Sequence, residues 1–293
     1  MNFRALIREH VPTPAIRWVR RKLTQVEARR RSRTRDALLR KYGTFTTQQL
    51  IQLLHEAGIE QDGILFVQCS YNDLHTYSGS PYELVCGLRE LVGPKGTLLM
   101  PAYTENMQQT PCRPFDVRRE PTYTGIAAEL FRREEGVFRS LHPRHSLCGI
   151  GPRAQELLEG HENCVYADGQ DSPFDRLQRA GAQSVCLGLT PGFTSFVHWL
   201  EDIEPEKHPT TAHDGPHQCV LRDHNGQELR RPFYRRVGGQ VMQAERVARN
   251  LSPEAMKQIR FYGIWICIYP LPILAAELLK LRDRGIVYYK YSA

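Results

Sequence analysis

The stretch Gly63-Ile64-Leu65-Phe66-Val67 is a compact apolar run, and Thr97-Leu98-Leu99-Met100-Pro101 is a second one further along the chain. Between them, a turn rich in Gly, Ser and Pro leads into residues 84–91, where leucine and valine recur at helical spacing. A strand, a polar turn, a helix and a second strand form a βαβ unit, which requires a parallel pair of strands. The sequence therefore predicts an α/β fold with a mostly parallel central sheet flanked by helices.

The same periodicities predict further elements on both sides of this unit. Thr46 resembles the start of a capping box, and the helix that it begins should end near Gly58. Residues 126–133 predict another helix, and 184–189 a buried strand. Late in the chain, Asp223-His224-Asn225-Gly226 predicts the turn of a β-hairpin. Amphipathic helices are expected over 240–249 and 271–281.

The basic charge of the chain is concentrated at its beginning. Residues 1–41 contain thirteen Lys or Arg and three acidic residues, whereas the rest of the 293 residues contain 26 bases and 29 acids. We therefore expect a basic helical extension over 1–41 and one large domain over 42–293.

The extension has three interpretations. The run 29–35 is typical of a solvated helix face or a flexible arm, but it also suits an acidic polymer or peripheral contact with an anionic membrane. The residues that could give it an apolar side are Leu6, Ile7, Ile16, Trp18, Val19 and Leu23. Nucleic acid is the weaker choice, because no base-reading motif follows. The sequence does not indicate an oligomeric state.

Several classes of protein do not fit the sequence. Apolar runs stay below the roughly 18 residues that a membrane-spanning helix requires. Arg4, Arg8 and Glu9 interrupt any signal-peptide core, so we expect a cytoplasmic protein, with attachment to the inner face of the membrane as the alternative. The eight cysteines form no C-x-x-C pair, so neither a metal site nor a disulfide framework is expected.

A candidate catalytic stretch, Thr194-Ser195-Phe196-Val197-His198-Trp199-Leu200-Glu201, follows the third predicted strand. On a helix, Ser195, His198 and Glu201 would share one face at the carboxyl end of that strand, where ligands bind in such sheets. A carboxylate that orients an imidazole is the minimum requirement for a general base. The alternative is a solvated helix face with an incidental histidine, because the H-x-x-E pattern is short.

Two other segments should lie near this stretch, and most other histidines should not. Residues 68–70 and 102–104 also follow strands, and the loop 103–122 is expected to be an ordered active-site loop. The histidines that need no role are His145, His208, His213, His217 and His224. The segment 208–224 has no regular ligand spacing and is expected to be a surface loop.

Five segments in chain order resemble the aminoglycoside 3-N-acetyltransferase family of acyl-CoA-dependent enzymes over residues 45 to 203. They are Phe66-Val67-Gln68-Cys69-Ser70-Tyr71, Gly96-Thr97-Leu98-Leu99-Met100-Pro101, Arg139-Ser140-Leu141-His142-Pro143-Arg144-His145-Ser146 with Gly151-Pro152-Arg153-Ala154, Asp171-Ser172-Pro173-Phe174-Asp175-Arg176-Leu177, and Leu187-Gly188-Leu189 leading to His198-Trp199-Leu200-Glu201. The resemblance implies an α/β/α sandwich and makes 42–293 an acyltransferase domain.

The resemblance also implies roles for individual residues. His198 and Glu201 fall on the family's acid/base pair, and Ser195 lies where the family usually has Thr. The family's His-Ser-Ser loop, which holds part of the coenzyme A arm, falls on Gln68, Cys69 and Ser70, so the first two residues differ from the family. The cofactor-binding candidates are Gln68, Cys69, Ser70, Tyr71 and Thr104, and the substrate-binding candidates are Asp73, His142, Ser146 and Ser172.

The implied activity is the transfer of an acyl group, acetyl first of all, from acyl-CoA to an amino group of an amino sugar or aminoglycoside-like small molecule. His198 would deprotonate the amine, and no metal takes part. Cys69 permits a rival mechanism through an acyl-enzyme. The carboxylates that could meet a cationic acceptor are Asp73, Glu105, Asp116, Asp202 and Glu204. A non-catalytic scaffold attached through residues 1–41 is the second hypothesis.

Overall fold

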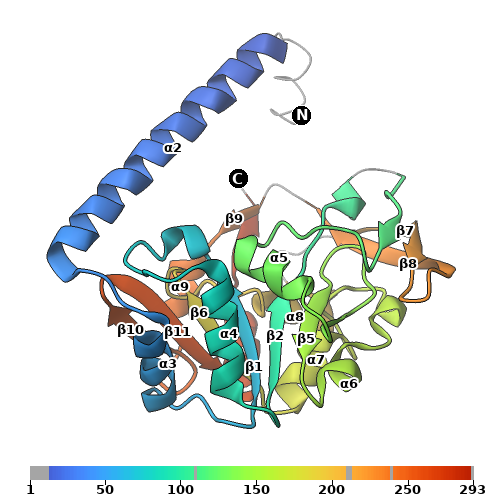
Figure 1. Ribbon diagram of the computed structural model, residues 1–293. Coiled ribbons are helices and arrows are strands. Elements are labelled where there is room, and N and C mark those ends of the chain that lie inside the picture. The colour runs from blue at the N-terminus through green and yellow to red at the C-terminus, as the bar shows by residue number, and fades with distance from the viewer. Residues whose placement is uncertain (1–12, 109–110, 209–212, 238–239, 292–293) are drawn as a thin grey trace.

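The computed structural model describes residues 13–108, 111–208, 213–237 and 240–291, and a seven-stranded sheet lies at its centre (Figure 1). The strand order is β10-β11-β6-β1-β2-β5-β4. The strands are β1 (Ile64–Cys69), β2 (Thr97–Pro101), β4 (Phe138–Arg139), β5 (Leu147–Ile150), β6 (Gln183–Leu187), β10 (Lys257–Phe261) and β11 (Ile264–Pro270). The predicted α/β class is confirmed.

The sheet is mixed, which refines the prediction of a mostly parallel one. β1 pairs in parallel with β2 and with β6, whereas every other pairing in the sheet is antiparallel. β10 and β11 are joined through Tyr262 and Gly263, whose φ angles are 47° and 77°. So short a turn permits only an antiparallel pair. This hairpin was not predicted, because β11 is buried along most of its length and shows no alternation of apolar and polar residues.

Helices cover both faces of the sheet. α3 (Thr47–Glu56), α4 (Pro81–Val92) and α5 (Ile126–Arg132) pack on one face, and α7 (Pro173–Arg179), α8 (Val197–Ile203) and α10 (Leu271–Asp283) on the other. A short helix, α6 (Ala154–Leu158), follows β5. The capping box at Thr46 and Gln49 is present, and Ser80 and Glu83 form a second one.

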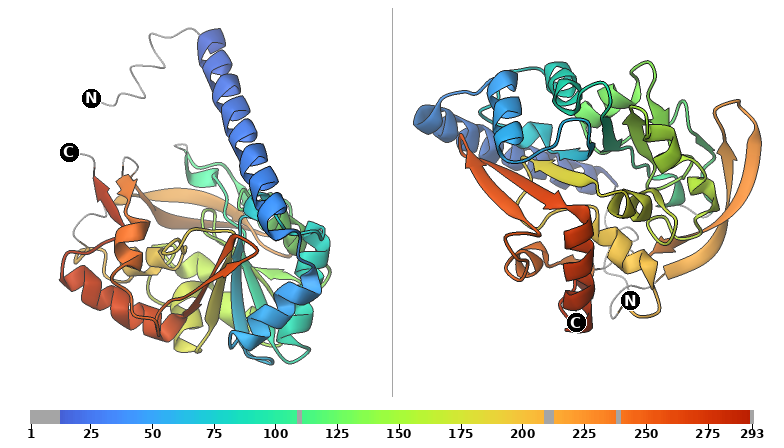
Figure 2. Two further views of the ribbon diagram at one scale, coloured as in Figure 1. Left: turned by 90° about the vertical axis from the view of Figure 1, so that its left-hand side faces the viewer. Right: turned by 90° about the horizontal axis from the view of Figure 1, so that it is seen from below.

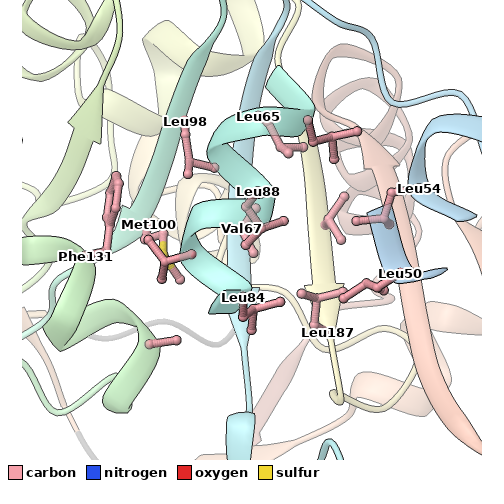
Figure 3. Close-up of a cluster of buried hydrophobic side chains, with 14 of the residues drawn as sticks. Leu50, Leu54, Leu65, Val67, Leu84, Leu88, Leu98, Met100, Phe131 and Leu187 are labelled. Carbon is pink, nitrogen blue, oxygen red and sulfur yellow. The ribbon is translucent and has the colours of Figure 1, made fainter. Parts of the chain in front are cut away.

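Alternate residues of β1 enter two separate cores. Leu65 and Val67 pack against leucines of α3 and α4 (Figure 3), while Phe66 faces the opposite side and packs on Phe174 of α7. Because both faces are covered, the strand is apolar throughout, as the central strands of such sheets are.

The predicted β-hairpin is present and longer than expected. β7 (His213–Arg222) and β8 (Glu228–Arg236) pair antiparallel, and β3 (Phe115–Asp116) adds a third strand. The segment 213–224 is therefore mostly a strand rather than the predicted surface loop. β9 (Gln240–Met242) pairs with β12 (Tyr289–Tyr291), so the helix expected over 240–249 shortens to α9 (Ala244–Ala248).

The basic extension contains one long helix, α2 (Thr13–Tyr42), which projects from the body of the molecule (Figures 1 and 2). Its last turns contact the β10–β11 turn: a Cβ placed on Gly263 would lie 2.6 Å from Leu38 and 2.9 Å from Tyr42. Leu6 and Ile7 lie outside the described residues, as do the side chains of Ile16, Trp18, Val19 and Leu23. In the described ranges, no helix is both long enough and apolar enough to cross a bilayer.

Substituting Gly263 tests the docking of α2. Gly263→Ala would add a methyl group where α2 lies and also strain a left-handed backbone, whereas Gly181→Ala meets only the strain, since nothing lies within 4 Å of its Cβ. We expect Gly181→Ala to cost about 1–2 kcal/mol of unfolding free energy. Gly263→Ala should cost more and should accelerate proteolytic cleavage within α2. Equal cleavage rates in the two variants would contradict this contact.

Candidate active site

The centre of the candidate site is a histidine–carboxylate pair on α8. His198 Nδ1 lies 2.7 Å from Glu201 Oε2, and the His198 side chain is 18% exposed while that of Glu201 is fully buried. With Nδ1–H donated to the carboxylate, Nε2 carries the ring's lone pair. Nothing in the described part of the chain is hydrogen-bonded to Nε2. The predicted one-face arrangement of His198 and Glu201 is therefore present, and the carboxylate orients the imidazole ring.

Ser195 lies in the turn before α8 rather than on the helix, because α8 begins at Val197. Its backbone N–H donates to Oε1 of Gln68 at 2.7 Å, and the Gln68 amide also donates to Thr194 Oγ1 at 3.1 Å. Gln68 is buried with its amide fully engaged, so it fixes the turn that carries Ser195. This geometry does not support the prediction that the Gln68 side chain binds coenzyme A.

Arg236, at the end of β8, holds three buried carboxylates together. Its guanidinium lies 2.9 Å from Asp168, 2.9 Å from Glu201 and 2.7 Å from Asp202, and it also donates to the carbonyl oxygen of His198. Buried charges are tolerated only when they are paired, and here one cation serves three anions. Sequence reasoning missed Arg236, because no motif surrounds it and it lies beyond the hairpin turn.

Two histidines that were expected to have no role lie in this cluster. His145 Nδ1 is 2.6 Å from Asp168, and its ring lies 5.2 Å from that of His198 and stacks on Tyr103 at 4.5 Å. His213, the first residue of β7, lies 3.0 Å from Asp202. These two contacts were not predicted, because spacing along the sequence does not reveal which carboxylate the fold places opposite a histidine.

Arg236 and the histidines keep these carboxyl groups ionised. Burial alone would raise the pKa of each, but His145 and Arg236 outweigh it at Asp168, whose pKa is held well below its usual value. The pKa of Glu201 is lowered because Arg236 and His198 outweigh burial. At Asp202, Arg236 and His213 outweigh burial in the same way. The His198 ring therefore has a charged carboxylate beside it at neutral pH.

The other cofactor-binding candidates differ in what they can offer. The Tyr71 hydroxyl donates to the carbonyl oxygen of Gly79, and buried Thr104 donates to that of Pro143, so both are used within the fold. Ser70 donates to Asp73 at 2.5 Å. Burial and then Asp73 raise the pKa of the Cys69 thiol to about 12, so the thiolate that an acyl-enzyme needs is scarce at neutral pH.

Three of the four substrate-binding candidates are buried structural residues. Ser172 caps α7, Ser146 donates to the carbonyl oxygen of Ala102, and His142 Nδ1 accepts from the backbone N–H groups of Arg144 and His145. None of the three is exposed to a ligand. The side chains of the S-P and H-P-x-x-S segments are thus used within the fold. The fourth candidate, Asp73, lines a different cavity, together with Arg31.

Few carboxylates remain for a cationic ligand. Asp202 is paired with Arg236, Glu204 with Lys207 and Arg282, and Asp116 accepts from the Arg118 backbone. Glu105 is exposed. Arg144 lies near Arg236, Asp202 and Asp168, and within the described ranges its guanidinium makes neither an ion pair nor a hydrogen bond. One guanidinium therefore remains available at the site.

Comparisons with known proteins show the family to which the chain belongs. The profile of the aminoglycoside 3-N-acetyltransferase family matches residues 66–272. Aminoglycoside N(3)-acetyltransferase III of Salmonella sp is 28% identical over 174 residues, which are 54% of this chain and 60% of the relative. Aminoglycoside N(3)-acetyltransferase VIII of Streptomyces fradiae is 26% identical over 187 residues, 57% of this chain and 64% of the relative. The chain thus spans less than two thirds of the length of each.

Solved structures share the fold. The crystal structure of aminoglycoside acetyltransferase AAC(3)-Xa has a TM-score of 0.71 at 20% identity and covers 86% of this chain and 98% of its own. AAC-IIIb, solved as a binary complex with CoASH, has a TM-score of 0.68 at 21% identity, with 82% and 97% covered. AAC-VIa bound to sisomicin has a TM-score of 0.69 at 20% identity, with 82% and 98% covered.

Removing the Arg236 charge should destabilise the whole protein. Arg236→Met leaves three carboxylates buried without their cation, and breaking a buried pair costs about 3–5 kcal/mol. Arg235→Met is the matched control, because Arg235 pairs with the partly exposed Asp214, and it should cost about 1 kcal/mol or less. Chemical denaturation measures both, and equal losses would refute the role assigned to Arg236.

Acid should destabilise the fold through buried histidines. Burial lowers the pKa of His145 and of His161 to about 4, against about 6.5 in an unfolded chain. The unfolded chain therefore binds more protons between these values, so stability is complete above pH 6.5 and falls as the pH drops toward 4. Each group contributes about 1.4 kcal/mol per pH unit in this window. Urea unfolding of His161→Gln should show a shallower pH dependence, and an unchanged slope would contradict the assignment.

Proposed function

Because the chain belongs to the aminoglycoside 3-N-acetyltransferase family, we propose that it transfers an acyl group from acyl-CoA to an amino group, with His198 as the general base. The observation that carries the proposal is the geometry of His198: its Nδ1 lies 2.7 Å from Glu201, and its side chain is partly exposed. An imidazole oriented in this way can accept a proton at Nε2.

The reaction is a direct transfer. An amine is protonated at neutral pH and cannot attack a thioester until it loses that proton. His198 Nε2 accepts it, Glu201 stabilises the imidazolium, and Arg236 holds Glu201 in its charged form. The amine nitrogen then bonds to the acyl carbon, the carbon–sulfur bond breaks, and the leaving thiolate takes up a proton. The proton held on His198 can go to this thiolate, and the nitrogen, now bonded to the acyl carbon, releases its second proton to solvent as the amide forms.

Two findings support an acyl-CoA donor. The likeness to AAC-IIIb, whose structure is a complex with CoASH, suggests the donor class. In this chain Ser70, Gly188 and Thr190 follow β1 and β6, at the edge of the sheet where ligands of such folds bind. These positions would hold the donor's arm, in place of the buried Gln68 side chain.

The acceptor is proposed to be a small-molecule amine of the amino-sugar class. Aminoglycosides are the first compounds to test, because relatives of this fold bind sisomicin and gentamicin. A specific observation favours a second candidate: Arg144 has no ion pair within the described residues, and this, with the scarcity of free carboxylates among the candidates, suits an amino sugar that carries an anionic group, as a nucleotide-linked sugar does. An acceptor panel containing both classes distinguishes them.

Substitution of His198 tests the mechanism. With acetyl-CoA and an accepted amine, His198→Gln should lower kcat about 10²- to 10⁴-fold, because positioned general-base catalysis supplies that much. Its affinity for acetyl-CoA, measured by calorimetry, should stay close to that of the parent. An active His198→Gln enzyme would refute the assignment.

Cys69→Ala is the matched test of the rival mechanism. A thiol with a pKa raised to about 12 is a poor nucleophile, so this variant should keep turnover within a few-fold of the parent. An acyl adduct on Cys69, detected by intact-mass measurement, would replace direct transfer with an acyl-enzyme. A parent protein that neither binds nor turns over any acyl-CoA would favour the scaffold hypothesis.

A further inference from the structure

A basic cavity lies where α2 meets the sheet. Its volume is about 760 Å³, and Arg30, Arg31 and Thr34 of α2 line it together with Arg260 and Trp265. The helix precedes the segment matched by the family profile, which begins at residue 66. We propose that this cavity binds the phosphate groups at the nucleotide end of the acyl-CoA donor, with α2 as one wall. The inference rests on the proposed donor class and adds a subsite built by the extension.

Residues that line the cavity are close in the sequence to the candidate catalytic residues. Asp73 follows β1, Gly188 and Thr190 follow β6, and Gly263 precedes β11, so all of them lie at the carboxyl edge of the parallel strands. A turn closed by the hydrogen bond from Phe193 N–H to the Thr190 carbonyl oxygen leads from the cavity to Ser195.

Residues at the end of β1 contact both the turn before α8 and the cavity. Gln68 binds the backbone of Ser195, while Ser70 donates to Asp73 in the cavity. A donor with a reactive thioester at one end of a long arm and phosphates at the other can therefore pass along these two loops from His198 to the arginines.

The charge of the cavity suits phosphate. Three arginines, Arg30, Arg31 and Arg260, line the cavity together with one carboxylate, Asp73. Arg31 Nε lies 3.8 Å from Asp73, in an ion pair whose members are 55% and 37% exposed. Such an exposed pair contributes little stability, so a phosphate can take the place of the carboxylate beside Arg31. One guanidinium group can donate two parallel hydrogen bonds to a phosphate, so arginine suits a phosphate site.

Two of the arginine-bearing walls are held in place. The Arg260 guanidinium lies over the Trp265 ring at 4.2 Å, and Leu38 packs against the core that contains Ile264. Gly263 lets α2 approach the turn because it has no Cβ. Figure 1 shows the last turns of α2 near β10, whereas the rest of the helix projects away from the body of the molecule.

A membrane is the less suitable occupant. Arg30, Arg31 and Thr34 line an open cavity between α2 and the sheet, whereas a bilayer surface would meet the outer side of the helix. Arg29 and Arg33 are exposed and do not line the cavity. They provide a matched pair of arginines on the same helix.

The test compares two double variants of the full chain. Arg30→Gln with Arg31→Gln should weaken the binding of acetyl-CoA roughly 10- to 100-fold by calorimetry, because charge-assisted hydrogen bonds to phosphate are lost. Affinity for S-acetyl-pantetheine, which lacks the nucleotide and its phosphates, should not change. Arg29→Gln with Arg33→Gln should bind acetyl-CoA as the parent does.

The other outcomes each overturn the inference. If the parent binds acetyl-CoA and the Arg30/Arg31 variant binds it equally well, the subsite is refuted while the proposed function stands. If both donors lose affinity equally, the arginines support the fold rather than bind phosphate. If only binding to vesicles of phosphatidylcholine and phosphatidylserine falls, the arginines serve a membrane. If the parent binds no acyl-CoA at all, the proposed function fails together with the inference.

Discussion

One cation organises the candidate active site. Arg236 lies within 3 Å of three carboxylates that are almost completely removed from solvent, and each of those carboxylates in turn contacts a histidine. Without the guanidinium the anions would repel one another in a region of low dielectric, and protonation would relieve the repulsion. The ionised Glu201 beside His198 thus depends on an arginine that never touches the histidine ring.

Local patterns along the chain predicted most of the scaffold. The apolar runs of β1 and β2, the cap at Thr46 and the Asn-Gly turn of the hairpin all depend on neighbours within a few residues, and all are present. The β10–β11 hairpin escaped because a strand buried along most of its length loses the alternation that marks strands. The βαβ unit indicates only the parallel pairs at the centre of the sheet. The antiparallel strands on both sides of them could not be predicted from it.

The site itself was only partly predictable. His198 and Glu201 were found because one helical turn joins them, whereas Asp168, His145, His213 and Arg236 meet only in the folded chain. Matching a family segment does not make a residue a ligand contact. Ser146 and Ser172 match such segments, yet their hydroxyl groups form hydrogen bonds with backbone groups. A motif marks a position that the fold needs, and only the three-dimensional arrangement separates residues that contact a ligand from those that shape the loop.

The register of the β7–β8 hairpin has a consequence for how the site forms. His213 and Arg236 are directly opposite each other, so the first and last residues of one local unit reach the carboxylates together. A hairpin pairs within microseconds, far faster than contacts between distant segments are completed. On a growing chain, Asp168, Glu201 and Asp202 emerge before their counter-ion. The candidate site is therefore expected to form late and in one step, when the hairpin arrives and neutralises the acidic cluster.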